Sequence, residues 1–357
     1  MKPAELVRQR LLSQHLAGTL FDKPEEAVSW LGAVQAQDYT GAKWSVAQRT
    51  NGVRDSTLDR ALAGGTILRT HILRPTWHFV VAADIRRMLT LTAPHVHARN
   101  ALYYRRLGLE ASVFRKIQRV LRRALEGGNQ LTRSELQEVL QQARLSQPED
   151  DRLRLAYIMM FAELEGWICS GARRGKQHTY ALLEERVPQT RPLGRDEALA
   201  ELARRYFTGH GPASLKDFRA WSGLSAGDAA AGLEMARSQL ERAVVQGEAY
   251  WLSPMAAGRT PLSPRAHLLP TYDEYTIAYR EHHAVLDPRH LQQVWAANGM
   301  VILVDGRVAG TWRRTFQKTS VTVSLRLFTP PTTVQRRAIE AAARRYGDFL
   351  DRPAVLA

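Results

Sequence analysis

Two glutamines separated by one residue, Gln35 and Gln37, are the side chains of this sequence best suited to chemistry that depends on positioning. They lie in the mostly apolar segment Val34-Gln35-Ala36-Gln37-Asp38-Tyr39. A glutamine amide is neither a strong base nor a nucleophile, but it both donates and accepts hydrogen bonds. It can therefore hold a water molecule in place or contact the edge of a nucleobase.

The spacing of the two amides decides whether they can act together. On a helix their side chains would point about 200° apart, whereas in an extended turn they share a side. Gly32 precedes the pair, and Asp38 and Gly41 follow it, so we expect a non-helical bend. The alternative interpretation is that the two amides cap backbone groups near a helix end.

The charge balance indicates a polyanionic partner. Lys and Arg total 50 against 35 Asp and Glu, for a formal net charge of +15 over 357 residues. Nucleic acid is the most common partner of such chains. A surplus that serves solubility alone is the alternative.

A cationic stretch between residues 99 and 123 carries much of this charge. Helical spacing over 112–125 places apolar residues on one side and cations on the other. We predict phosphate contacts there from Arg115, Lys116 and Arg119, with a merely solvated helix face as the alternative.

Two hairpin tips carry further cations. Arg173, Arg174 and Lys176 are predicted to lie along a DNA groove, or else to protect a sheet edge by charge. Arg313 and Arg314 form a second predicted DNA-binding hairpin, and Lys43 is predicted to contact a phosphate.

Several classes of protein are disfavoured. The eleven histidines show no metal-ligand spacing, so neither a metal nor a cofactor is expected. Cys169 is the single cysteine, which rules out a disulfide within the chain and fits a reducing cytoplasm. Because we find no signal peptide and no apolar run of about 18 residues, we expect a cytoplasmic, nucleoid-associated monomer without a membrane span.

The order of elements predicts an α+β fold. Helices followed by a pair of short strands recur three times, which indicates three tandem winged-helix units and then a small, mainly β region. The predicted boundaries are 1–95, 96–190, 191–255 and 256–357. The predicted helices cover 4–15, 24–33, 56–63, 112–125, 132–140, 150–165, 196–207, 214–221, 225–240 and 333–349. The predicted strands cover 67–72, 76–81, 167–170, 179–183, 243–245, 250–252, 300–304, 307–311 and 320–328.

Helix caps and turns support these boundaries. Ser56 with Asp59, Thr132 with Glu135, and Ser214 with Asp217 have the spacing of N-terminal caps. Asp305-Gly306 between apolar runs predicts a hairpin turn.

Taken together, the sequence resembles the AlkZ-like family of bacterial winged-helix DNA glycosylases. The resemblance spans nearly the whole chain. It rests on the segments Val34–Gln37, Lys43–Ser45, Leu73–His78, Leu269–Tyr275 and Asp305–Trp312. It implies a Gln-apolar-Gln active-site motif, here Gln35 and Gln37, on a concave basic surface that binds double-stranded DNA containing alkylated bases.

The resemblance also implies a reaction. A monofunctional glycosylase without strand-cutting activity would hydrolyse the N-glycosidic bond of N7-alkylated purines and unhook interstrand cross-links. Gln37 would orient the water, Gln35 would fix the water or the lesion, and Asp38 is our own addition as a source of negative charge near the sugar. The rival hypothesis is a non-enzymatic winged-helix DNA-binding protein, either a regulator or chromosome-associated. RNA binding is the weakest option, because no RNA-binding motif is evident.

Overall fold

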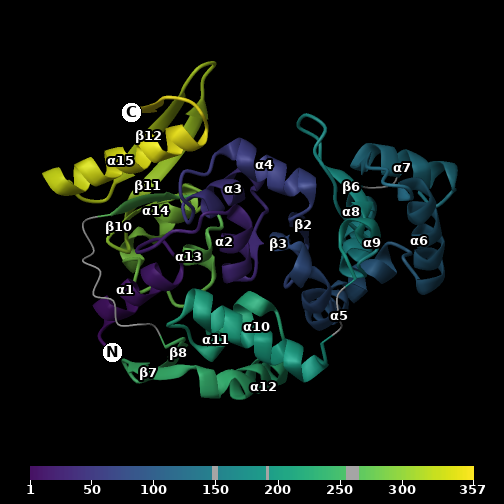
Figure 1. Cartoon of the computed structure of the whole chain (residues 1–357), viewed down its shortest axis with the longest axis horizontal. Coiled ribbons are helices and arrows are strands. Elements are labelled where there is room, and N and C mark those ends of the chain that lie inside the picture. Colours follow the sequence, from purple (N-terminus) through teal and green to yellow (C-terminus); the bar gives the residue numbers. More distant parts are fainter. Residues whose placement is uncertain (147–151, 190–192, 255–264) are drawn as a thin grey trace.

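The computed structural model describes residues 1–146, 152–189, 193–254 and 265–357. The N-terminal unit occupies the centre of the molecule, with the C-terminal sheet on one side and the second unit on the other (Figure 1). Its elements are α1 (Pro3–Ser13), α2 (Pro24–Leu31), β1 (Val34–Gln35), α3 (Tyr39–Ala47), α4 (Asp55–Gly64), β2 (Ile67–His71) and β3 (Trp77–Val81).

The sheet of this unit carries the amide motif. Its strands pair antiparallel in the order β1-β3-β2, and Gln35 lies opposite His78. Helix α2 is followed by Gly32, whose φ of 76° suits a glycine and turns the chain into β1. The predicted non-helical bend at Gln35 and Gln37 is therefore confirmed. The predicted cap at Ser56 is wrong, because α4 begins at Asp55 and Ser56 lies inside it.

The second unit contains the predicted order of helices and hairpin. Its elements are α5 (Ala82–Arg106), α6 (Ala111–Leu125), β4 (Leu131–Thr132), α7 (Arg133–Gln142), α8 (Arg152–Leu164), β5 (Ile168–Ser170), β6 (Thr179–Leu182) and α9 (Leu183–Arg186). The capping box of Thr132 and Glu135 is confirmed. The start predicted for the helix at 150–165 lies outside the described residues, which resume at Arg152. The unit boundary drawn between residues 95 and 96 falls inside α5.

The third unit lies along α5 and α2. Its elements are α10 (Arg195–His210), α11 (Leu215–Ser222), α12 (Ala226–Ala236), the 3-10 turn η1 (Arg237–Gln239), β7 (Glu241–Val245) and β8 (Glu248–Leu252). The cap formed by Ser214 and Asp217 is confirmed, as is the closing hairpin. The helix predicted over 225–240 is shorter, since α12 ends at Ala236.

The C-terminal region forms a larger sheet than predicted. Its elements are β9 (Ala266–Leu269), α13 (Glu274–Ile277), η2 (Pro288–His290), α14 (Leu291–Ala296), β10 (Val301–Val304), β11 (Arg307–Phe316), β12 (Val321–Leu327), α15 (Thr333–Phe349) and β13 (Ala354–Leu356). The strand order is β13-β12-β11-β10-β9, and Asp305-Gly306 joins β10 to β11 as predicted.

The C-terminal region shares a hydrophobic core with the N-terminal unit. A single buried cluster contains residues of α2, α3, β3, β9, β10, β12 and α15. Trp44 of α3 illustrates this, because its Nε1 donates to the Leu268 carbonyl at 2.6 Å and its ring packs against Tyr346. Residues 256–357 were predicted as a separate domain, but the described part packs as an extension of the first unit. Among the described residues, no helix combines the length and apolarity that a membrane span requires.

Candidate active site

Gln35 is held at both its backbone and its side chain. Its backbone N–H donates to Glu274 Oε1 at 2.9 Å, and its side-chain Oε1 accepts from Arg74 Nη2 at 2.8 Å. Because a guanidinium only donates, the amide oxygen must face Arg74. The residue is 8% exposed, and within the described chain no partner occupies its Nε2. The amide is thus fixed with its donor end free.

Gln37 lies two residues further on, and its side chain is exposed. Its Oε1 accepts a hydrogen bond of 3.3 Å from the backbone N–H of Trp77. Both amide oxygens are therefore held by donors from one short stretch, Arg74 to Trp77, between β2 and the start of β3. Gln35 lies deeper in the protein than Gln37.

The peptide between the two glutamines is held as well. Arg69 of β2 donates from Nε to the Ala36 carbonyl at 3.1 Å. Arg69 is nearly buried and stacks on Trp77, with 4.3 Å between the guanidinium carbon and the ring centroid. The segment Gln35–Gln37 is consequently anchored at each of its three residues.

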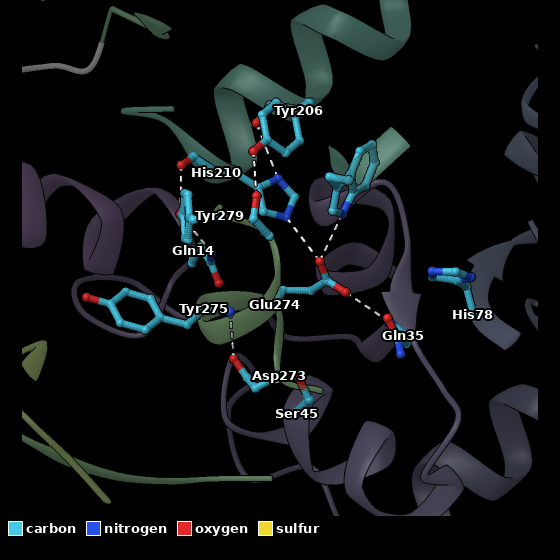
Figure 2. A network of polar contacts seen from close by, with 12 residues as sticks. Gln14, Gln35, Ser45, His78, Tyr206, His210, Asp273, Glu274, Tyr275 and Tyr279 are labelled. Carbon is cyan, nitrogen blue, oxygen red and sulfur yellow. Dashed lines mark hydrogen bonds and ion pairs between the residues drawn. The ribbon is translucent and has the colours of Figure 1, made fainter. Parts of the chain in front are cut away.

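Glu274 connects the motif to the third unit (Figure 2). This fully buried carboxylate accepts from the Gln35 backbone through Oε1 and from Trp221 Nε1, at 2.9 Å, through Oε2. His210 Nε2 lies 3.5 Å from Oε2. Segments from three regions of the chain therefore meet behind Gln35, and sequence reasoning gave none of these partners a role.

The neighbouring Asp273 fixes the same turn. Arg49 contacts both of its carboxylate oxygens, at 2.9 Å and 3.0 Å, and Ser45 Oγ donates at 2.6 Å. Burial alone would raise the pKa of Asp273, but Arg49 and these hydrogen bonds hold it below its ordinary value. Asp273 therefore remains ionised and serves the fold.

The histidine nearest the motif is uncharged at neutral pH. His78 is fully buried, and burial and then the charge of Arg74 hold its pKa well below the usual value. Its Nδ1 contacts the Thr76 carbonyl at 2.9 Å. Among the described residues, no group of His, Cys, Asp and Glu could hold a metal ion. The site thus offers oriented amides and a neutral imidazole.

Comparison with known proteins identifies the family. The model of the family described as "DNA glycosylase AlkZ-like" matches residues 28–349. The chain belongs to this family. An interstrand DNA cross-link repair glycosylase of Streptomyces sahachiroi is 25% identical to it over 339 residues, covering 88% of each chain. The solved structure of the Streptomyces sahachiroi DNA glycosylase AlkZ is similar in fold, with a TM-score of 0.83, 22% identity and 100% of both chains covered. The predicted family and the α+β class are confirmed.

Two predicted site residues serve the fold of this AlkZ-like chain. Asp38 caps α3 by accepting from the Gly41 N–H at 3.1 Å, and it pairs with Arg314 at 3.1 Å. Because Arg314 already pairs with this carboxylate, the predicted role of Asp38 near the sugar is wrong. Lys43 is 1% exposed, and its Nζ lies 2.8 Å from both Asp55 and Asp59. A buried, doubly paired ammonium cannot reach a phosphate, so the predicted phosphate contact of Lys43 is wrong.

The predicted DNA-binding residues divide by exposure. Arg115, Lys116 and Arg119 lie exposed on α6, while its buried face carries Phe114, Ile117, Leu121 and Leu125. Their role in binding stays a prediction.

The hairpin cations have more varied surroundings. Lys176 is exposed, Arg174 pairs with Glu135, and Arg173 is half-buried and donates to the Lys176 carbonyl at 3.0 Å. Arg313 is exposed and donates to the Ala296 carbonyl at 3.0 Å. Arg314 contacts Asp38, Thr40 and Tyr346, and its side chain is 14% exposed, so it is better explained as a structural residue.

Proposed function

We propose that this chain is a monofunctional DNA glycosylase that hydrolyses the N-glycosidic bond of N7-alkylated purines. The observation that supports the proposal best is the pair of anchored amides, Gln35 and Gln37, beside a neutral His78. Alkylation at N7 gives the base a positive charge, so it leaves without being protonated. The remaining task is to place a water molecule and stabilise a cationic sugar, which depends on geometry and field.

The two amides have different roles in this mechanism. Gln37 is exposed, and its Oε1 has a second lone pair beyond the one that Trp77 uses, so it can orient a water molecule. Gln35 presents the donor end of its amide because Arg74 occupies its oxygen. This donor is suited to fix the water or an acceptor atom of the damaged nucleotide.

The surroundings of the nearby lysine support the proposed absence of strand cutting. A lyase requires an amine that attacks the sugar carbon, and an amine attacks only after it loses its proton. Lys43 is close to the motif in sequence, but its ammonium is buried between Asp55 and Asp59. An ammonium held 2.8 Å from each of two carboxylates is not free to approach a sugar carbon.

We further propose that the chain unhooks interstrand cross-links. The relative named an interstrand DNA cross-link repair glycosylase covers 88% of this chain. Gln37, the outer member of the motif, is exposed, so a bulky adduct meets it without first entering a closed pocket. This arrangement differs from that of enzymes that rotate a small base into a snug cavity.

The test uses duplex DNA with one N7-methylguanine and a second duplex with an N7-linked cross-link. Release of free base, followed by strand breakage only after hot alkali, supports a monofunctional glycosylase. Strand breakage without alkali contradicts the monofunctional assignment. Binding of both duplexes without base release favours the non-enzymatic DNA-binding protein.

A further inference from the structure

Arg69 is a nearly buried cation without a counter-ion. It is 9% exposed, and among the described residues no carboxylate lies within ion-pair distance of its guanidinium. The negative charge of Glu163 favours the charged form of Arg69 from beyond ion-pair distance, and the Glu163 carboxylate itself contacts His71. Apart from the Nε–H donated to Ala36, no acceptor among the described residues receives a guanidinium hydrogen. Burying a charge in this way is costly unless an anion completes the site.

A second arginine with an unused donor faces the same space. Arg173 has a buried Nε with no acceptor, and its guanidinium carbon lies 4.7 Å from the centroid of the Tyr39 ring. Burial lowers the pKa of Arg69; the charge of Glu163 raises it in part, and the charge of Arg173 lowers it. Both arginines line one small pocket, where a bound anion would relieve the repulsion between their charges.

A pocket of roughly 220 Å³ lies between these arginines. Its polar lining consists of Tyr39, Asp59, Arg69, Ser170, Arg173 and His178. Burial and then the charges of Arg69 and Arg173 lower the pKa of His178 to about 4, so this ring adds no charge at neutral pH. The Asp59 carboxylate already accepts from Lys43 and from the Tyr39 hydroxyl. Lys43 is shared with Asp55, so Arg69, Arg173 and Lys43 together face two carboxylates, and the balance at the pocket is positive.

The small pocket shares two lining residues with a larger one. Arg69 and His178 also line a space of roughly 530 Å³ that includes Trp77 and Arg133. Trp77 donates to Gln37, and Arg69 donates to Ala36, so both spaces adjoin the amide motif. A linear polyanion that passes over the motif can reach this pocket.

We propose that Arg69 and Arg173 bind one phosphodiester group of the damaged DNA strand in the smaller pocket. A guanidinium fork matches phosphate oxygens and holds them in a fixed geometry. Through its bond to Ala36, Arg69 then sets the distance between that phosphate and the two amides. The identity of the strand rests on the proposed function, whereas the phosphate site itself does not.

The experiment combines a protein variant with a chemical change in the DNA. Methylphosphonate, which is uncharged, replaces one phosphate at a time on each side of N7-methylguanine. Affinity and single-turnover base release are measured for the parent and for Arg69→Gln. We expect one position at which the substitution weakens parent binding by about 10- to 100-fold. Arg69→Gln should bind the unmodified duplex about as weakly as the parent binds the duplex with methylphosphonate at that position. Placing methylphosphonate there should then weaken the binding of Arg69→Gln by little more.

Controls separate a bound phosphate from a general loss of charge or of folding. Arg119→Gln removes an exposed cation of α6. It should weaken binding of the unmodified duplex and of the methylphosphonate duplex by the same factor. Arg69→Lys should recover part of the affinity, and thermal denaturation shows whether each variant is folded. Independent effects would make the fold loss in affinity from Arg69→Gln multiply with that from methylphosphonate. If this is seen at every position, the proposed site is wrong.

The two proposals fail in different measurements. Should the parent release no base, the glycosylase assignment fails, yet coupling between Arg69 and one phosphate in the affinity measurement would still establish the site. Should base be released normally while no position shows coupling, the phosphate site fails and the glycosylase assignment stands.

Discussion

Glu274→Gln is the sharpest perturbation of the scaffold behind the motif. The carboxylate accepts from the Gln35 N–H on one oxygen and from Trp221 Nε1 on the other, each at 2.9 Å. Glutamine has the same shape but replaces one acceptor with an NH₂ group. In either orientation a donor then faces a donor in a fully buried position.

The magnitude follows from these contacts. Hydrogen bonds to a charged group contribute about 1.5–3 kcal/mol net, and a buried donor without a partner costs about 1–3 kcal/mol. A loss of about 3 kcal/mol in the free energy of unfolding is therefore expected. Because the entropy of unfolding is about 2.1 cal/mol/K per residue, this loss lowers the Tm of a 357-residue chain by about 4 °C. Displacement of the Gln35 backbone should also slow base release by about 10- to 100-fold.

The assay is single-turnover release of N7-methylguanine from duplex DNA, at a temperature where the variant is fully folded by circular dichroism. The matched control is Glu281→Gln, the same change at an exposed carboxylate, which should leave both rate and Tm unchanged. A Glu274→Gln variant as stable and as active as the parent would refute the assigned role of the carboxylate.

Two further predictions concern binding and acid stability. Arg115, Lys116 and Arg119 are changed together to glutamine, and the logarithm of DNA affinity is plotted against the logarithm of salt concentration. The slope should become shallower by about 0.9 for each phosphate that α6 no longer neutralises. An unchanged slope would show that α6 does not contact the DNA. The folded pKa of Asp273 is depressed, so its stabilising contribution is present above the unfolded pKa of about 3.9 and is lost as pH falls through the folded value. Asp273→Asn should therefore lower the Tm at about pH 6 and flatten its decline toward about pH 3, whereas a decline parallel to that of the parent would contradict this.

Local patterns in the sequence were sufficient to predict the position of the motif and most elements. Gly32 and the residues that follow it gave the extended turn, and three cap or turn signals were found where expected. Helix α3 was missed because residues 41–47 are all buried, so it lacks the polar face that marks a surface helix. Helix α5 was not predicted, and one reason is that Pro94, which lies inside it, usually marks the end of a helix.

The partners of the motif could not be predicted in the same way. Gln35 and Glu274 are 239 residues apart in sequence, so no local spacing connects them. Lys43 was predicted to be a surface cation. Asp55 and Asp59, which lie one turn apart on a single helix, could have indicated a lysine paired with both of them. Arg69 carried no signal, because only the folded chain shows that its charge is buried without a counter-ion.

The central claim is that two anchored amides perform the hydrolysis, and the most direct test is base release by the double variant Gln35→Ala, Gln37→Ala. We predict that single-turnover release of N7-methylguanine falls by at least about 100-fold, while affinity for the same duplex is retained. Release at the parental rate by a folded double variant would contradict the account.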